Sequence, residues 1–155
     1  MKTIPSFSID HTKLKKGMYI SRIDDDVVTY DVRMKEPNHG DYLSNEGIHT
    51  IEHLYATYVR NTEFDDNIIY VGPMGCRTGF YFLTRNLPHE TALKLTQEAM
   101  DFIINFEGEI PGATAEGCGN YKEHSLSDAK EIAKEFKKIL ESWSVQKMSY
   151  RYHGI

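Results

Sequence analysis

The chain has 155 residues and a formal net charge of −5, with 40% apolar and 26% charged residues. This length and composition describe one globular domain whose core is large enough to surround an internal site. Lysine and arginine gather only mildly, at Lys13–Lys16 and Lys130–Lys138, so no nucleic-acid partner is expected, because phosphate backbones are bound by dense basic clusters. No apolar run approaches the ~20 residues of a membrane span, and the N-terminus lacks the apolar core of a signal peptide. We therefore expect a cytoplasmic protein with no membrane partner.

The first half of the chain alternates strands with one helix. Met18–Ile23 and Val27–Met34 are strand-like runs joined by a short acidic turn, which predicts a β-hairpin. Apolar residues recur at steps of three and four through Gly47–Asn61, which is the spacing of one helical face. Asn67–Val71 and Gly79–Thr84 then predict two further strands on either side of a glycine-containing turn.

The second half is predicted to be mainly helical. Pro88–Phe106 carries apolar residues at helical spacing, with a proline at its start. A glycine-rich loop then surrounds Cys118, and Ser125-x-x-Asp128 is a helix-start signal for Leu126–Ser144. His124 directly precedes this start, and we assign it a structural role. The element order predicts an α+β fold: a single domain in which an antiparallel β-sheet is covered by helices.

The spacing His49-x-x-Glu52-His53 lies inside the first predicted helix. Residues at i and i+4 share a helical face with Cβ atoms ~5–6 Å apart, so both imidazoles can bind one metal ion. Glu52 stands beside them without being needed as a ligand, which is the placement of a general base. The spacing is the inverted zincin motif, and the alternative is a helix that carries two surface histidines.

A third metal ligand is required to distinguish these alternatives, and Cys118 is the best candidate. It lies between Gly117 and Gly119, which allow the backbone to approach a bound group closely. Two histidines and a thiolate with a fourth position open are typical of a catalytic metal site. Zn²⁺, Fe²⁺ and Co²⁺ all suit such ligands.

Three other residues have types that suit chemistry or binding. Cys76 lies in the turn between the second pair of predicted strands, next to Arg77, whose positive charge favours a reactive thiolate. It acts as an acid or base beside the metal, or it is a small buried residue at a strand end; a disulfide with the other cysteine is a third alternative. His11 and Arg33 have side chains that suit binding a polyhydroxylated or charged substrate.

Several ordered motifs together resemble one family, the S-ribosylhomocysteine lyases or LuxS family, from residue 6 to about residue 140. They are Ser6-Phe7, Asp10-His11-Thr12-Lys13, Asp31-Val32-Arg33 with Pro37-Asn38, His49-Thr50-Ile51-Glu52-His53-Leu54, Pro73-Met74-Gly75-Cys76-Arg77-Thr78-Gly79-Phe80-Tyr81, and Cys118-Gly119 with His124-Ser125-Leu126.

The resemblance implies a carbon–sulfur lyase acting on a small molecule. Its substrate would be S-ribosylhomocysteine, cleaved by carbonyl migration and β-elimination to homocysteine and 4,5-dihydroxy-2,3-pentanedione, the precursor of the quorum-sensing signal autoinducer-2. Residues 1–155 would form a single lyase domain in a homodimer with active sites near the subunit interface. One divalent metal per subunit, Fe²⁺ in the family, is implied, with Zn²⁺ or Co²⁺ as substitutes. The implied roles are metal binding for His49, His53 and Cys118, proton transfer for Glu52 and Cys76, and substrate binding for Ser6, His11 and Arg33.

The chain departs from the family pattern before Cys76, where Tyr70 and Gly72 replace the usual Asp and Ser. Because that Asp helps to hold the homocysteine part in the family, amino-acid recognition is the least secure expectation. One rival interpretation is a small inverted-zincin metallopeptidase in which Glu123 or Glu131 replaces the cysteine ligand. The other rival is a non-catalytic, metal-bound dimeric module.

Overall fold

The computed structural model describes residues 1–155 and contains one four-stranded antiparallel sheet and three α-helices. In space the strands follow the order β1-β2-β4-β3. The element order confirms the predicted ββαββαα arrangement and the α+β class, although the last helix ends three residues earlier than predicted. None of the helices combines the length and hydrophobicity needed to cross a membrane. The elements are β1 (Gly17–Asp24), β2 (Val27–Arg33), α1 (Asn45–Val59), β3 (Ile68–Pro73), β4 (Gly79–Arg85), α2 (His89–Asn105) and α3 (Leu126–Glu141).

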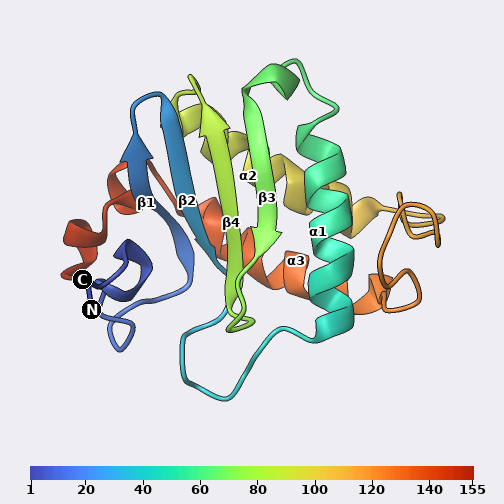
Figure 1. Cartoon of the computed structure of the whole chain (residues 1–155), viewed down its shortest axis with the longest axis horizontal. Coiled ribbons are helices and arrows are strands. Elements are labelled where there is room, and N and C mark those ends of the chain that lie inside the picture. The colour runs from blue at the N-terminus through green and yellow to red at the C-terminus, as the bar shows by residue number, and fades with distance from the viewer.

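Helices cover one face of the sheet. α2 and α3 lie behind the strands, and α1 packs beside β3 (Figure 1). Because successive strand residues point to opposite faces, alternate side chains of the central strands face these helices. They are Val28, Tyr30 and Val32 of β2 and Phe80 and Phe82 of β4, all buried in one hydrophobic core. This core holds α1 against the edge strand β3.

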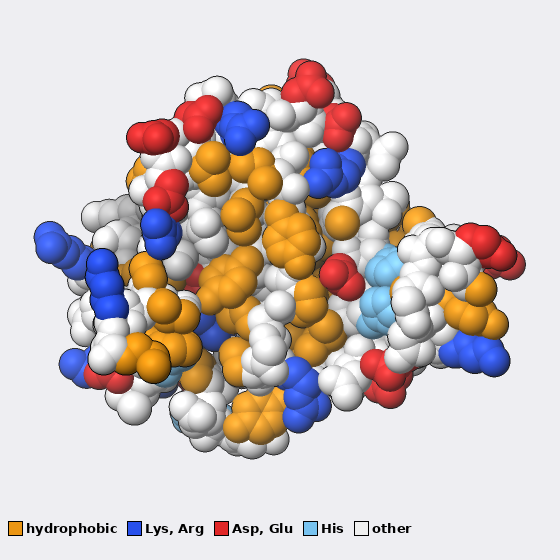
Figure 2. Space-filling view, in the orientation of Figure 1, with side chains coloured by type: hydrophobic (Ala, Val, Ile, Leu, Met, Phe, Trp, Pro, Cys, Tyr) orange, Lys and Arg blue, Asp and Glu red, His pale blue; other side chains and the backbone are white.

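No α-helix covers the opposite face of the sheet, although Tyr150 of a C-terminal 3-10 helix packs there on β1 and β2. Tyr81 and Leu83 of β4 are half-buried there, and Tyr70 of β3 is 51% exposed. Figure 2 shows a broad hydrophobic area over β4 and β3 on this face. A contiguous apolar area of this kind, at the surface of a folded chain, is typical of an interaction site.

The turn between β3 and β4 is held against the end of β2. The amide of Arg77 donates to the carbonyl of Met74 at 3.0 Å, which places Cys76 inside a tight turn. Arg77 takes a positive φ of 60°. Gly79 lies so close to the backbone of Val32 that a Cβ atom would collide with its carbonyl oxygen. This close approach brings the Cys76 turn beside β2.

The first turns of α1 and α3 are joined by polar contacts. Ser44 caps α1, because its Oγ accepts from the amide of Gly47 at 3.0 Å. The same hydroxyl donates to Asp128 Oδ2 of α3 at 2.8 Å. Ser125 caps α3 by accepting from the amide of Asp128, which confirms the predicted helix start. The segment that precedes α3 is therefore held beside the N-terminal end of α1, close to His49.

Candidate active site

His49 and His53 lie on one face of α1, as their spacing predicts, with ring centroids 4.7 Å apart. Each ring is anchored through Nδ1: His49 contacts the carbonyl oxygen of Glu123 at 2.8 Å, and His53 that of Pro111 at 2.7 Å. A carbonyl only accepts hydrogen bonds, so both Nδ1 atoms carry the proton. The Nε2 lone pairs are consequently free for a metal ion. Histidines that bind metals usually donate their other ring N–H to such an acceptor, which fixes the same tautomer.

Cys118 joins the two histidines from the loop between α2 and α3. Its Sγ lies 3.2 Å from His49 Nε2. The loop is shaped by a turn in which the amide of Cys118 donates to the carbonyl of Thr114 at 3.0 Å. Two imidazole nitrogens and a thiol sulfur are a donor set that fits a divalent transition metal. The expected ligand set is thus brought together in space.

His124 is a member of the same cluster that sequence reasoning missed. One ligand atom from each of His49, His53, Cys118 and His124 lies within 4.8 Å of the others. The His124 ring stacks on that of His49, with centroids 3.9 Å apart and an interplanar angle of 21°. Burial, and then the neighbouring His49 and His53 rings, lower the pKa of His124 to about 4. Its position before a helix start gave no signal of this, because the contact depends on how α3 packs against α1.

Glu52 lies on α1 between the two histidines and is half-buried. Its carboxylate forms no hydrogen bond or ion pair within the chain. It is therefore not committed to a structural contact, and its carboxylate is available to a molecule bound beside the cluster.

A separate cavity of about 460 Å³ gathers the other predicted site residues. The Cys76 thiol lies 3.0 Å from Thr78 Oγ1 and 4.0 Å from a guanidinium nitrogen of Arg33. Both cysteines are free, so the disulfide alternative is wrong. None of His49, Glu52, His53, Cys118 or His124 lines this cavity, whose lining includes Ser6, His11, Arg33 and Cys76.

Arg33 is almost fully buried, with 3% of its surface exposed. Its guanidinium donates to both carboxylate oxygens of Asp31, at 3.0 and 2.9 Å, and to Thr78 Oγ1 at 2.8 Å. Burial alone lowers the pKa of Arg33, but the charge and hydrogen bonds of Asp31 more than offset this, so the pKa is raised. Arg77, expected to act on the thiol, instead lies over the ring of Tyr42. The cation beside Cys76 is therefore Arg33.

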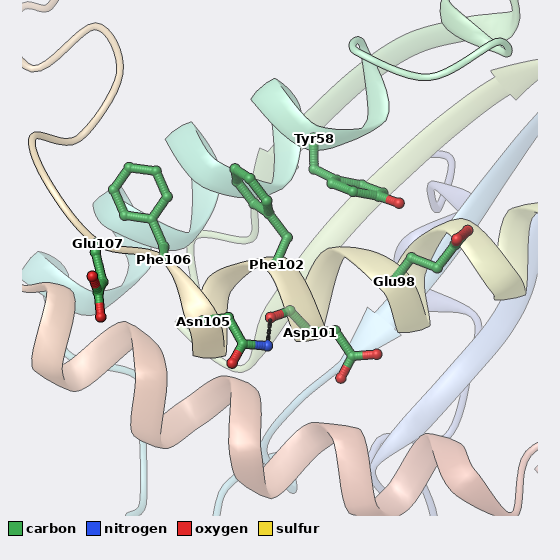
Figure 3. Close-up of a pocket in the computed structure, with 7 residues that line it drawn as sticks. All are labelled: Tyr58, Glu98, Asp101, Phe102, Asn105, Phe106 and Glu107. Carbon is green, nitrogen blue, oxygen red and sulfur yellow. Dashed lines mark hydrogen bonds between the residues drawn. The ribbon is translucent and has the colours of Figure 1, made fainter.

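Another surface hollow, of about 500 Å³, lies along α1 and α2 and has no part in this chemistry (Figure 3). Asn105 donates to the backbone carbonyl of Asp101 at 2.9 Å, and the Asp101 carboxylate pairs with Lys137. No histidine or cysteine lines the hollow, which is formed by Tyr58, Glu98, Asp101, Phe102, Asn105, Phe106 and Glu107.

Fold and cluster together define a small α+β protein with a potential metal site, whose candidate ligands come from one helix and one later loop. The chain belongs to the S-ribosylhomocysteinase (LuxS) family, whose model matches residues 4–147. It is 48% identical to the S-ribosylhomocysteine lyase of Phocaeicola vulgatus over 157 residues, which cover 97% of this chain and 98% of the relative. It is 46% identical to the S-ribosylhomocysteine lyase of Porphyromonas gingivalis and 44% identical to that of Borreliella burgdorferi. Both matches cover 97% of this chain and 99% of the relative. The family resemblance of the motifs is thus confirmed.

Proposed function

We propose that the protein is an S-ribosylhomocysteine lyase that releases homocysteine and 4,5-dihydroxy-2,3-pentanedione. The observation that carries this proposal is the cluster of His49, His53 and Cys118 in a chain of this family, with Glu52 on the same helix. Residues 1–155 act as a single lyase domain. The enzyme works in the cytoplasm, where its product supplies autoinducer-2 synthesis and homocysteine returns to the methyl cycle.

The metal of this site is a single divalent ion per subunit, and Fe²⁺ is the proposed native ion. His49 Nε2, His53 Nε2 and Cys118 Sγ would hold it, and Zn²⁺ or Co²⁺ would be accepted by the same donors. Bound there, the ion supplies Lewis acidity that polarises a carbonyl oxygen of the substrate. No change in its oxidation state is needed, because the atoms of the two products add up to those of the substrate.

Glu52 and Cys76 carry the protons. Breaking the thioether by β-elimination requires an acidic C–H bond next to a carbonyl, so the sugar carbonyl must first migrate toward the carbon that bears sulfur. Each migration removes a proton from one carbon and returns one to its neighbour. A carboxylate and a thiol on opposite sides of the sugar suit these transfers, and the leaving thiolate of homocysteine takes up a proton at the end.

Ser6, His11 and Arg33 bind the substrate in the cavity beside Cys76. Arg33 is held rigidly by Asp31, so its remaining donor capacity is fixed in direction. At the family's Asp and Ser positions, the ring of Tyr70 lies over Gly72 and fills the space of a side chain there. Neither residue lines the cavity, so we infer that recognition of the amino-acid part uses other groups here.

The enzyme acts as a homodimer whose active sites form between subunits. Two observations support this. The cavity with Cys76 lacks the metal ligands, so one chain presents two separate halves of a site. The uncovered apolar face of the sheet shares Tyr81 with that cavity, and a second copy packed on this face would cover the cavity mouth with its own residues (Figure 2). Sedimentation of the purified protein tests the dimer, and a monomer that turns over substrate contradicts it.

The lyase activity is tested by incubating anaerobically purified, Fe²⁺-loaded protein with S-ribosylhomocysteine and titrating the released thiol. Stoichiometric release of homocysteine is the expected result. Peptide cleavage without thiol release would instead favour the metallopeptidase, and neither reaction in metal-loaded protein would favour the non-catalytic module.

A further inference from the structure

The three histidines of the cluster are anchored in two different ways. His49 and His53 each contact a carbonyl through Nδ1, which makes that nitrogen the donor and leaves Nε2 as a lone pair. The Nδ1 atom of His124 instead lies 2.9 Å from the hydroxyl oxygen of Thr50, a group that can donate or accept. The tautomer of His124 therefore depends on the other contacts of Thr50.

The contacts of Thr50 settle the direction of that hydrogen bond. Thr50 is fully buried, and its Oγ1 already accepts from the amide of Ser125 at 2.9 Å. The hydroxyl has one other partner, which is His124 Nδ1. Since a buried hydroxyl proton needs an acceptor, it is donated to His124 Nδ1. Neutral His124 consequently carries its own proton on Nε2, the reverse of His49 and His53.

The Nε2 atom of His124 is buried and has no hydrogen-bond partner within the chain. A buried donor without a partner is costly, so this nitrogen needs a partner from outside the chain, and a bound ligand would supply one. The ring stacks on His49 and lies 4.7 Å, centroid to centroid, from His53. A protonated nitrogen has no lone pair for a metal ion, but it is a hydrogen-bond donor placed beside three metal ligands.

We propose that His124 is a further catalytic residue, which donates a hydrogen bond from Nε2 to the sugar oxygen of the substrate on which negative charge develops. The identity of that oxygen rests on the proposed lyase function. The role itself is that of an oxyanion-hole donor, fixed in advance by Thr50 and therefore ready without rearrangement. His124 is not a fourth metal ligand in this arrangement, and the ligand set stays at two histidines and one cysteine.

The first test measures anion binding to the Co²⁺-loaded protein and does not depend on the reaction. Azide is titrated while the visible absorption of cobalt is followed. His124→Phe keeps a flat ring but has no donor, and should bind azide about 10- to 100-fold more weakly, the value of a hydrogen bond to a charged group. His124→Gln retains an N–H donor and should recover part of the affinity. Cobalt content should stay at one ion per chain in both variants.

A second pair of variants tests the tautomer without changing the histidine. Thr50→Val removes the hydroxyl that fixes His124 and should also weaken azide binding. Thr57→Val, on the same helix, is the control, because the Thr57 hydroxyl has no hydrogen-bond partner, and it should bind azide as the wild type does. Unchanged azide affinity in both His124→Phe and Thr50→Val overturns the proposal. Loss of cobalt in His124→Phe also overturns it, since His124 would then be a metal ligand.

Turnover gives a third readout. If the protein is a lyase, His124→Phe should lower kcat about 10²- to 10³-fold with little change in KM, because the charge on the oxygen develops only during reaction. A rise in KM at unchanged kcat overturns this role. If the wild-type protein shows no lyase turnover, the proposed function fails, while the azide titrations still decide the role of His124 as a donor.

Discussion

The structure of the candidate metal site identifies which ring nitrogen of each of His49 and His53 is available to a metal ion. Backbone carbonyls hold Nδ1 of His49 and His53, so both Nε2 atoms carry lone pairs, and Nε2 of His49 lies 3.2 Å from Cys118 Sγ. Sequence spacing predicts that the two histidines share a helical face, but not the carbonyls that select their tautomer. Those carbonyls belong to Pro111 and Glu123, in loops whose course depends on tertiary packing.

Removing one ligand should remove the metal. His53→Ala or Cys118→Ala leaves two protein donors, and we predict that metal content falls from one ion per chain to a small fraction of that. His39→Ala is the control, because His39 contacts Pro37 and Glu36 outside the cluster. Metal analysis of protein purified without oxygen gives the answer. Full occupancy in either ligand variant would remove that residue from the ligand set.

Removing a proton-transfer group should leave the metal in place. Cys76 lies in the separate cavity and Glu52 makes no structural contact, so neither substitution disturbs the ligands. Cys76→Ala and Glu52→Gln should each lower turnover about 10²- to 10⁴-fold, the usual contribution of a general acid or base. Metal content should equal that of the wild type. Wild-type turnover in Cys76→Ala, or a loss of metal that matches the loss of turnover, would contradict the assignment.

At the scale of elements, the first turns of α1 and α3 are linked by the hydroxyl of Ser44, which caps one helix and donates to Asp128 of the other. Ser44→Ala should lower the free energy of unfolding by about 1–2 kcal/mol, because it removes a helix cap. It should also weaken metal binding, since this link keeps the segment before α3 beside α1. The stability of Ser44→Ala is compared by urea unfolding with that of Ser142→Ala, because Ser142 is an exposed serine at the end of α3. Equal stability of the two variants would show that the link is unimportant.

The C-terminal turns support the buried ion pair behind the cavity. The hydroxyl of Tyr150 donates to Asp31 Oδ2 at 2.7 Å, and its ring stacks on Tyr19. Burial, and then the charge of Asp31, raise the pKa of Tyr150, so the hydroxyl stays protonated as a donor. Tyr150→Phe should lower the free energy of unfolding by about 1.5–3 kcal/mol, the value of a hydrogen bond to a charged group. The exposed hydroxyl of Tyr152 has no hydrogen-bond partner, so Tyr152→Phe should change the free energy of unfolding little. Equal unfolding midpoints for Tyr150→Phe and Tyr152→Phe would show that the hydrogen bond from Tyr150 to Asp31 does not stabilise the fold.

At the scale of the whole molecule, the sequence predicts the hairpin, all three helices, the antiparallel sheet and the clustering of His49, His53 and Cys118, because these follow from local periodicity, turn chemistry and spacing. Two features do not follow from local patterns. His124 enters the cluster only because α3 packs against α1. The separation of Cys76 from the candidate metal ligands depends on which elements line the cavity, and no local sequence pattern carries that information.

The central claim is that one lyase site uses the Cys76 cavity of one subunit and the metal cluster of another. The most direct test co-expresses Cys76→Ala and His53→Ala chains with different tags and isolates the mixed dimer. One of its two sites then combines an intact cavity with an intact metal cluster, so we predict about half the wild-type release of homocysteine per dimer. Each variant homodimer, having no intact site, should be nearly inactive. A mixed dimer no more active than the two homodimers would contradict the account.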